Sequence, residues 1–317
     1  MNELVNIKLN TENTTPLPTQ QPEELAFVES TYRYDALRNA DVNGLSFDRR
    51  PMLVTLFGIS ECGKTTFVGS LFAILCRHPQ LLKSTFIDSD TLTGFQRRVH
   101  TRYLSEKGLS EQPRTQRRAG SILNVVLGDE HGENQRMVVF SDLSGEIYND
   151  AASKDDVVLQ QTAVKYADKL VIFVDTEKLL PTKNNAYKAL FQSLLSRFKE
   201  KDMFTSKTEY FLVFNKADLV KDKIDKARAE IKDRDELERK CKEIMTLWEQ
   251  RKQSVLDIVN PLVVVPSDNI YEICSKEIGY DNENPNLIAL FNRLITEKTP
   301  TPLPSEYNWI QKLVKSK

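Results

Sequence analysis

The chain has 317 residues, of which 40% are hydrophobic and 28% charged, so it can build and cover a globular core. Its 44 basic and 45 acidic side chains give a formal net charge of −1, which provides no long-range field to gather nucleic acid or anionic lipid, and we expect neither as a partner. Four scattered cysteines without a C-x-x-C pair argue against a zinc knuckle and a disulfide framework.

The N-terminal region carries no targeting signal that we recognise. Residues 1–15 lack the basic start and apolar run of a secretory signal, and no stretch approaches the ~20 apolar residues of a membrane helix. We therefore expect a cytoplasmic protein without a membrane span. Residues 11–22 are polar and rich in proline, which predicts a partly disordered N-terminal extension over residues 1–48.

Strands and helices are expected to alternate over residues 49–298. The predicted strands are Leu53–Phe57, Ser121–Leu127, Arg136–Ser141, Lys169–Asp175, Tyr210–Phe214 and Ile270–Cys274. The predicted helices are 65–76, about 92–105, 156–167, 185–199 and 286–296. Continuous apolar strands are typical of a parallel sheet covered on both faces, and the turn-rich stretch after Leu127 suits a hairpin. We predict a three-layer α/β fold, mostly parallel, with one antiparallel hairpin strand.

A glycine-containing loop follows the first predicted strand. The run from Gly58 to Thr65 reads GISECGKT and matches G-x-x-x-x-G-K-[ST] between a strand and a helix, which predicts a phosphate-binding P-loop. Its backbone N–H groups would surround phosphates, Lys64 would reach the β- and γ-phosphates, and the Thr65 hydroxyl would bind Mg²⁺. The candidate binding residues are Gly58, Ser60, Glu61, Cys62, Gly63, Lys64, Thr65 and Thr66.

A second motif, D-L-S-G-E, follows the strand that ends at Ser141. Asp142 at the end of a buried strand is placed to anchor Mg²⁺ through its outer shell. Gly145 is expected to offer its N–H to a γ-phosphate. By itself D-x-x-G is a common turn sequence. Because it follows a strand downstream of a P-loop, it indicates a nucleotide-binding motif here.

A third motif, N-K-A-D, follows the strand that ends at Phe214. The Asp218 carboxylate can accept hydrogen bonds from N1–H and the 2-amino group of guanine, a donor pair that adenine lacks. Asn215 would brace the loop, and Lys216 would lie along the base or ribose. The sequence therefore predicts a guanine site, which argues against a P-loop ATPase.

A highly charged insertion follows this motif, from residue 221 to about residue 253. Apolar residues at helical spacing predict one side of a long helix, which either packs on the domain or serves as a partner-binding arm. These residues are Leu237, Cys241, Ile244 and Trp248.

The three motifs, in this order, resemble those of P-loop GTPases, the large class that includes Ras-like and translation-factor proteins. The resemblance covers residues 53 to about 297 and leaves 299–317 as a C-terminal tail. It implies a further guanine-contacting loop, which Ser275 and Lys276 fit although the family's alanine is missing. The run Leu262–Val265, with Ser267 and Asp268 after it, competes for that role.

The same resemblance implies a mobile threonine that closes on Mg²⁺. Thr115 is our candidate, with Thr91, Thr93 and Thr101 as alternatives. Neighbouring Arg114 is either an internal arginine finger or a surface residue.

Catalysis is the weakest part of the resemblance. Ras-like proteins place a glutamine where this chain has Glu146, whose charge near a γ-phosphate predicts slow intrinsic turnover. We expect a guanine-nucleotide switch that hydrolyses GTP to GDP with Mg²⁺ and contacts a protein effector or partner GTPase. The alternative is a nucleotide-dependent binding module with little hydrolysis. More narrowly, GKTT, PRT and DLSGE resemble a bacterial group called double-GTPases, which are associated with conflict or defence gene clusters.

Overall fold

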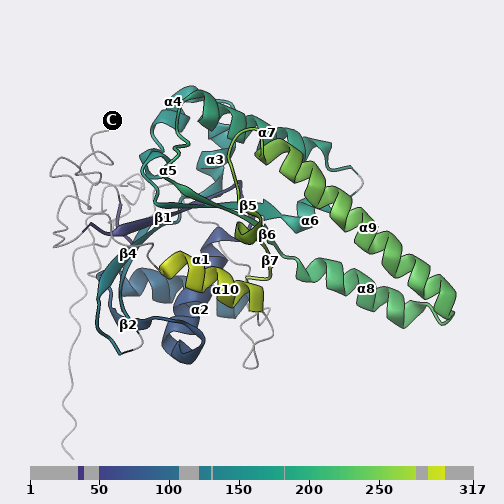
Figure 1. Cartoon of the computed structure of the whole chain (residues 1–317), viewed down its shortest axis with the longest axis horizontal. Coiled ribbons are helices and arrows are strands. Elements are labelled where there is room, and N and C mark those ends of the chain that lie inside the picture. The colour runs from purple at the N-terminus through teal and green to yellow at the C-terminus, as the bar shows by residue number, and fades with distance from the viewer. Residues whose placement is uncertain are drawn as a thin grey trace, which may run out of the picture. The chain divides into compact units, whose positions relative to one another are not determined.

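A mixed β-sheet forms the centre of the structure. A computed structural model of the chain describes residues 35–38, 50–106, 121–129, 131–181, 183–275 and 285–296, with only the backbone of residues 101–106 (Figure 1). The sheet has seven strands in the order β2-β3-β4-β1-β5-β6-β7. The strands are β1 (Met52–Phe57), β2 (Thr85–Asp88), β3 (Ile122–Gly128), β4 (Arg136–Ser141), β5 (Lys169–Asp175), β6 (Glu209–Asn215) and β7 (Ile270–Ile273).

The strand directions confirm the predicted fold class. β4, β1, β5, β6 and β7 are parallel, and β3 is antiparallel to both of its neighbours. In the register, Asp175 of β5 lies opposite Asn215 of β6, and Asn215 lies opposite Ile273 of β7. The carboxyl ends of these three strands therefore meet at one edge of the sheet, where parallel α/β sheets bind ligands. β7 also confirms Ile270–Cys274 as the sheet member rather than Leu262–Val265.

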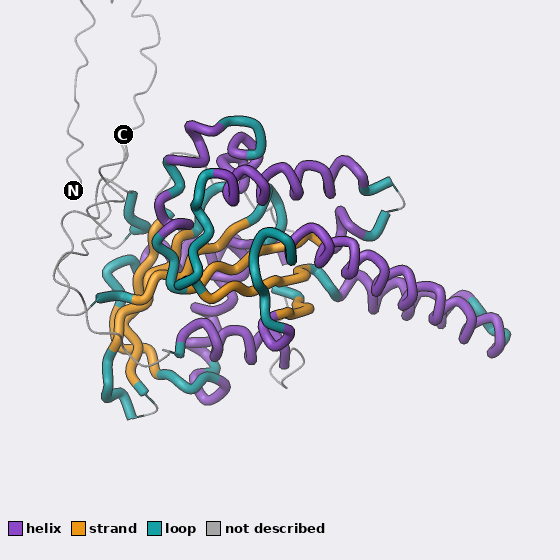
Figure 2. The backbone as a smooth tube through the Cα atoms, turned by 45° about the horizontal axis from the view of Figure 1, so that its top comes forward, coloured by secondary structure: helices purple, strands orange, loops and turns teal. Residues whose placement is uncertain are grey.

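Helices cover both faces of the sheet. Figures 1 and 2 show α1, α2 and α10 on one face and α3, α4, α5 and α7 on the other. The helices are α1 (Lys64–Arg77), α2 (Leu92–Glu106), α3 (Gly145–Ala151), α4 (Asp155–Leu159), α5 (Thr162–Lys165), α6 (Thr176–Leu179), α7 (Asn185–Glu200), α8 (Asp218–Glu230), α9 (Arg234–Val259) and α10 (Pro285–Ile295), with short 3₁₀ turns at Pro79–Leu81 and Ser267–Asn269.

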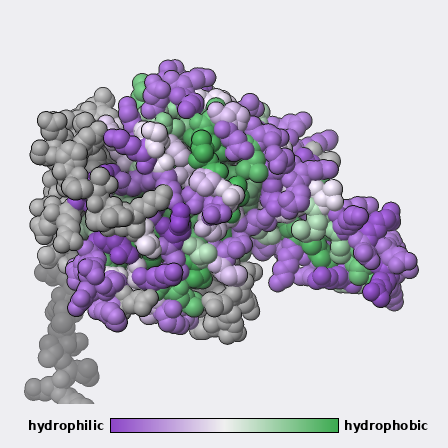
Figure 3. Space-filling view, viewed as in Figure 1, coloured by the Kyte–Doolittle hydropathy of each residue, from purple (hydrophilic) through white to green (hydrophobic). Residues whose placement is uncertain are grey.

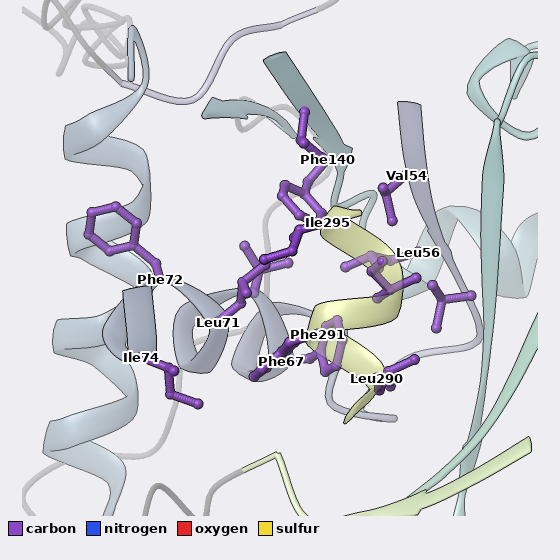
Figure 4. Close-up of a cluster of buried hydrophobic side chains, with 14 of the residues drawn as sticks. Val54, Leu56, Phe67, Leu71, Phe72, Ile74, Phe140, Leu290, Phe291 and Ile295 are labelled. Carbon is purple, nitrogen blue, oxygen red and sulfur yellow. The ribbon is translucent and has the colours of Figure 1, made fainter. Parts of the chain in front are cut away.

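Side chains of the central strands alternate between two hydrophobic cores. Phe173 of β5 packs with α1 and α10, whereas the adjacent Val174 packs with α3, α7 and α9. In the first core, the centroid of the Phe67 ring lies 4.7 Å from that of the Phe291 ring (Figure 4). The centroid of the Phe173 ring lies 5.2 Å from that of Phe67. This packing fixes α1, and with it the start of the P-loop helix, against the sheet.

Residues 156–167 form two short helices where the sequence predicted one. Gln161, between α4 and α5, leaves helical geometry (φ −85°, ψ 57°), and its Nε2 donates to the carbonyl of Val157 at 2.8 Å. The Thr55 hydroxyl of β1 donates to the carbonyl of Ala163 at 2.7 Å. The prediction was wrong because this contact with a distant strand leaves no local pattern. The short elements β2, α3 and α6 were also missed.

The charged insertion is an antiparallel pair of helices, α8 and α9, of which α9 is the long helix that the apolar spacing predicted. The Asp233 carboxylate accepts the N–H of Glu236 at 2.8 Å and so begins α9 with an N-cap. The predicted apolar stripe lies on the half-buried or buried side of α9 at Leu237, Cys241, Ile244 and Trp248. In Figure 3 apolar side chains follow the line where α8 meets α9, and most of the remaining surface of the pair in this view is hydrophilic. The stripe therefore serves packing within the chain.

Part of the predicted N-terminal extension contacts the sheet. Leu37 forms an isolated antiparallel bridge with Ile122, and its carbonyl accepts the N–H of Ser121 at 3.1 Å. Most of the extension and the tail at 299–317 lie outside the described residues, so the division of the chain stays a prediction. In the described part, no helix has the length and apolar character needed to cross a bilayer.

Candidate functional site

The P-loop connects β1 to α1 in a conformation that depends on glycine. Gly63 has φ 90°, and a Cβ built on it would lie 2.1 Å from Nδ2 of Asn215. Glu61 also has positive φ, at 69°. The loop therefore turns sharply before α1, whose N-terminal N–H groups point out of the helix as in phosphate sites. Thr66 lies in the first turn of α1 and is buried.

Lys64 is buried and folded back over this loop. Its Nζ donates to the carbonyls of Gly58 at 2.7 Å and Ile59 at 3.1 Å, and lies 5.5 Å from the centroid of the Tyr148 ring. The buried Tyr148 hydroxyl donates to the carbonyl of Leu56 at 3.0 Å, and burial raises the pKa of this phenol. A positive charge is thus held at the centre of the loop.

The side chain of Cys62, which the sequence analysis counted among the candidate binding residues, belongs to the hydrophobic core. Its side chain is fully buried in the first core, and burial raises the pKa of the thiol. The Cys62 side chain therefore does not face a ligand, although its carbonyl takes part in the loop contacts described below.

Thr65 and Asp142 meet at the start of α1. The Thr65 hydroxyl donates to Oδ1 of Asp142 at 3.1 Å, and the Asp142 side chain is fully buried. Arg98 of α2, which the sequence analysis missed, donates from Nε to Oδ2 of the same carboxylate at 2.9 Å. The only local sign of this role was the position of Arg98, three residues after Phe95 and therefore on the apolar side of a predicted helix.

The donors present here fit Mg²⁺ bound together with phosphates. Mg²⁺ uses one or two protein oxygens and completes its shell with water and substrate phosphate oxygens. Thr65 and Asp142 offer such oxygens side by side. Among the described residues, no three His, Cys, Asp or Glu side chains gather into a metal cluster, so a metal held by protein alone is not indicated there.

Gly145 packs directly against the P-loop. A Cβ built on it would lie 2.4 Å from Cα of Ser60 and 2.5 Å from its nitrogen. Asn149, one turn along α3, joins the same residue: its Nδ2 donates to Oγ of Ser60 at 3.1 Å, and its Oδ1 accepts the Ser60 N–H at 3.3 Å. Glu146 lies in the first turn of α3 behind the Ser144 N-cap. The second motif is therefore held against the first by backbone contact.

Replacing Gly145 with alanine is expected to lower the free energy of unfolding by about 2–3 kcal/mol, the upper part of the ~1–3 kcal/mol typical of overpacking. The new methyl would meet the Ser60 backbone, which cannot rotate away as a side chain can. Urea denaturation measures the loss. Ser144→Ala is the control, because it removes only the N-cap of the same helix, at a cost of about 1 kcal/mol. Equal losses in the two variants would contradict the close-packing argument.

Asn215 connects three parts of the site. Its Nδ2 donates to the carbonyl of Cys62 at 2.9 Å, and its Oδ1 accepts both the N–H of Ser275 at 3.0 Å and the Ser275 hydroxyl at 2.8 Å. The Ser275 carbonyl in turn accepts the hydroxyl of Ser70 in α1. Asn215 therefore joins the P-loop, the N-K-A-D loop and the loop after β7.

Asp218 stands at the start of α8 with one oxygen unpaired. Its Oδ1 is buried and has no hydrogen-bond partner among the residues that the structure describes. An unsatisfied buried acceptor is costly, about 1–3 kcal/mol, and such groups cluster where a ligand supplies the missing partner. The Asp218 carboxylate is therefore chemically suited to accept donors from a bound base.

The Lys216 ammonium is bound by two carboxylates near the end of β5. Its Nζ donates to Oδ2 of Asp175 at 3.0 Å and to Oε2 of Glu177 at 2.7 Å. Burial raises the pKa of Asp175, and the Lys216 charge partly offsets this. Burial acts to lower the pKa of Lys216, but the two carboxylates outweigh it and raise that pKa. The ammonium is thus held at the end of β5.

Lys178 of α6 contacts the outer side of the P-loop, and the sequence analysis missed it. Its Nζ donates to the carbonyl of Ser60 at 3.2 Å and to Oε2 of Glu61 at 3.0 Å. Glu61, which the sequence analysis proposed as a ligand contact, therefore forms an ion pair with Lys178 on the outer side of the P-loop. A lone lysine in a four-residue helix carries no local signal for this role.

Several predicted residues lie outside the described part of the chain. These are Arg114, Thr115 and Lys276, and the side chain of Thr101. Thr91, one alternative for the mobile threonine, is fully buried where α2 begins, and its hydroxyl is 3.1 Å from Oδ1 of Asn124. It cannot close on a metal without breaking that contact. Thr93 lies in α2 and is half-buried.

A family model agrees with this geometry. The model named Double-GTPase 2 matches residues 52–263, which is more than half of the chain. The chain belongs to the Double-GTPase 2 family. It is therefore a GTP-binding protein of the P-loop GTPase class. The match begins with β1 and contains all three motifs, whereas β7 and Ser275 lie beyond its end.

Solved structures give weaker likenesses to this Double-GTPase 2 protein. A bacterial selenocysteine-specific elongation factor EF-Sec is 12% identical with a TM-score of 0.30, covering 71% of this chain and 26% of that one. Two structures of the Ski7 GTPase-like domain of S. cerevisiae also match, each covering 78% of this chain and 50% of that one. The structure bound to GDP and inorganic phosphate has 13% sequence identity and a TM-score of 0.37. The structure bound to GTP has 12% identity and a TM-score of 0.38. The chain thus spans half or less of these proteins, and such scores add nothing to the fold assignment. No curated protein matches the chain significantly.

Proposed function

We propose that this Double-GTPase 2 protein binds GTP and GDP with Mg²⁺, hydrolyses GTP to GDP, and acts as a molecular switch that a protein partner reads. The buried, unpaired Oδ1 of Asp218 carries the proposal. It lies in a loop that Asn215 joins to the P-loop and to Ser275. An acceptor held there selects a base with two adjacent donors, which guanine has and adenine lacks.

The residues of the P-loop would bind the phosphates. Its backbone N–H groups and the N-terminus of α1 favour negative charge, and Lys64 adds a full positive charge. Lys64 now satisfies the carbonyls of Gly58 and Ile59. Phosphate oxygens would compete for the same ammonium, so the contacts of Lys64 are expected to differ between the free and bound protein.

Thr65 and Asp142 would hold Mg²⁺. When bound, the ion would neutralise phosphate charge as the terminal phosphoryl group leaves. The Thr65 hydroxyl offers a direct oxygen ligand, and the buried Asp142 carboxylate can orient the surrounding water. Thr115 remains our candidate for a further ligand, and Arg114 for an internal arginine finger.

Hydrolysis is proposed to be slow because Glu146 stands where Ras-like proteins have glutamine. Glu146→Gln is expected to increase the single-turnover rate of phosphate release about tenfold, since it removes a negative charge close to the expected γ-phosphate. Asp150→Asn, a charge removal farther along α3, is the control and should leave the rate unchanged. A slower Glu146→Gln variant would instead show that the carboxylate helps to activate water.

Nucleotide binding is the first test of the proposal. Purified protein should bind fluorescent GDP and GTP in the presence of Mg²⁺ and reject ADP and ATP. Adenine binding, or no binding, would contradict the guanine assignment. Binding without measurable single-turnover phosphate release would favour the alternative, a nucleotide-dependent binding module.

The partner is proposed to be a protein, either an effector or a second GTPase, and the location cytoplasmic. Affinity capture with GTP-loaded against GDP-loaded protein would test the first point, because a switch partner must prefer one state. The resemblance to bacterial double-GTPases suggests a conflict or defence system. A phage-challenge assay that compares the wild-type chain with a Lys64→Ala variant would test that role.

A further inference from the structure

Arg98 is an arginine in a position where a helix normally places an apolar residue. It lies on the buried side of α2 between Phe95 and Val99, and the whole residue is only 9% exposed. Its Nε donates to Oδ2 of Asp142 at 2.9 Å, and its Nη1 donates to the carbonyl of Gly94 at 3.0 Å. The neighbouring Arg97 points outward and pairs with Asp35.

The packing of α2 on α1 fixes the place of Arg98. A Cβ built on Gly69 of α1 would lie 3.2 Å from the carbonyl carbon and oxygen of Arg98. The absence of a side chain at Gly69 therefore lets the two helices approach closely, just beyond the turn of α1 that carries Thr65. Arg98 is thus built into the same helix pair as the expected metal ligand.

The Asp142 carboxylate requires a positive partner. It is fully buried, and an uncompensated buried charge is strongly destabilising. Arg98 supplies that charge, while the Thr65 hydroxyl occupies the other oxygen. A divalent cation beside Thr65 and Asp142 would supply the same compensation from the opposite side. Two cations close to one carboxylate repel each other, so each weakens the binding of the other.

We propose that Arg98 is a positioning residue that acts as the counter-cation of Asp142 when no metal is bound, and so lowers the affinity of the site for Mg²⁺. The inference rests on the proposed function, because it needs the Mg²⁺ and nucleotide site at Thr65 and Asp142. Arg98 then releases or loosens its contact with Asp142 when the site is filled.

The test is the Mg²⁺ concentration that gives half-maximal binding of fluorescent GDP. Arg98→Gln should lower this concentration about tenfold, because the competing charge is gone. Arg98→Lys, which keeps a cation, should restore most of the wild-type requirement. Arg97→Gln is the matched control on the same helix and should match the wild type. A purely structural role would destabilise the protein without increasing its affinity for Mg²⁺.

A second measurement uses the wild-type chain and does not depend on how the variants fold. Amide hydrogen exchange of the peptides from α2 should become faster by at least twofold when Mg²⁺ and GDP are added, relative to GDP with a chelator. The same comparison in α10 should show no change, because α10 lies on the same face of the sheet but none of its described side chains hydrogen-bonds to Asp142.

The outcomes separate the two proposals. If the wild type binds GDP with Mg²⁺ but Arg98→Gln needs as much Mg²⁺ or more, Arg98 does not compete for Asp142 and the inference alone is wrong. Exchange in α2 that is unchanged or slower with Mg²⁺ would also overturn it. If the wild type binds no guanine nucleotide under any Mg²⁺ concentration, both the inference and the proposed function fail.

Discussion

Asp218→Asn is expected to weaken the binding of GDP and GTP about 10²–10³-fold while the binding of xanthosine nucleotides improves. The carboxylate would accept two donors from guanine, and each hydrogen bond to a charged group contributes ~1.5–3 kcal/mol. The oxygen of an asparagine amide can accept the N1–H of guanine, but its NH₂ group then faces the 2-amino group, so that two donors meet. Xanthine has an oxygen at that position, which the amide can donate to.

The Asp218 variant also has a stability signature. Because Oδ1 of Asp218 is buried and has no hydrogen-bond partner among the described residues, the substitution breaks no hydrogen bond at this atom in the free protein. The melting temperature without nucleotide should therefore stay the same or increase. Isothermal titration with GDP and xanthosine diphosphate, together with thermal melts, measures both effects.

Asp222→Asn is the matched control for this experiment. Asp222 lies one turn farther along α8 and is exposed, so the same chemical change there should leave base selectivity intact. Unchanged guanine selectivity in Asp218→Asn would mean that the N-K-A-D loop is a structural turn, and the guanine assignment would have to be abandoned.

Lys64→Ala is expected to reduce the affinity for Mg²⁺-bound GTP and GDP by more than about 100-fold, because it removes the charge that the P-loop directs at the phosphates. The variant also leaves the carbonyls of Gly58 and Ile59 without their buried donor. We therefore expect a loss of about 1–3 kcal/mol in unfolding free energy as well. Nucleotide titrations below the lowered melting temperature separate the two effects.

Lys178→Ala provides the matched control for Lys64. Lys178 also donates to a P-loop carbonyl, that of Ser60, but from the outer side and from a more exposed position. Its removal should change nucleotide affinity by less than about threefold, since exposed ion pairs contribute little. Lys64→Ala protein that keeps wild-type affinity would show that phosphates are not bound at this loop.

The amino-acid sequence alone determined six of the seven strands, all except β2, and the three motifs that follow them. This was possible because each signal is local. A continuous apolar run such as Lys169–Asp175 predicts a strand buried on both faces, and GISECGKT needs only its own strand and helix to be recognised. Parallel strands then require the motifs at their carboxyl ends to meet, which the register of Asp175, Asn215 and Ile273 shows.

Only the tertiary structure decided which side chains complete the site. Arg98 contacts Asp142 across 44 residues, and Lys178 contacts Glu61 across 117. The break at Gln161 and the turn that makes two helices of α8 and α9 likewise depend on packing and capping rather than on periodicity. The role of a charged residue on the apolar side of a helix cannot be predicted before its partner is known, because the energy of the ion pair depends on the distance between the charges and on their burial. Local sequence contains neither quantity, so the counter-charge of Asp142 became visible only in three dimensions.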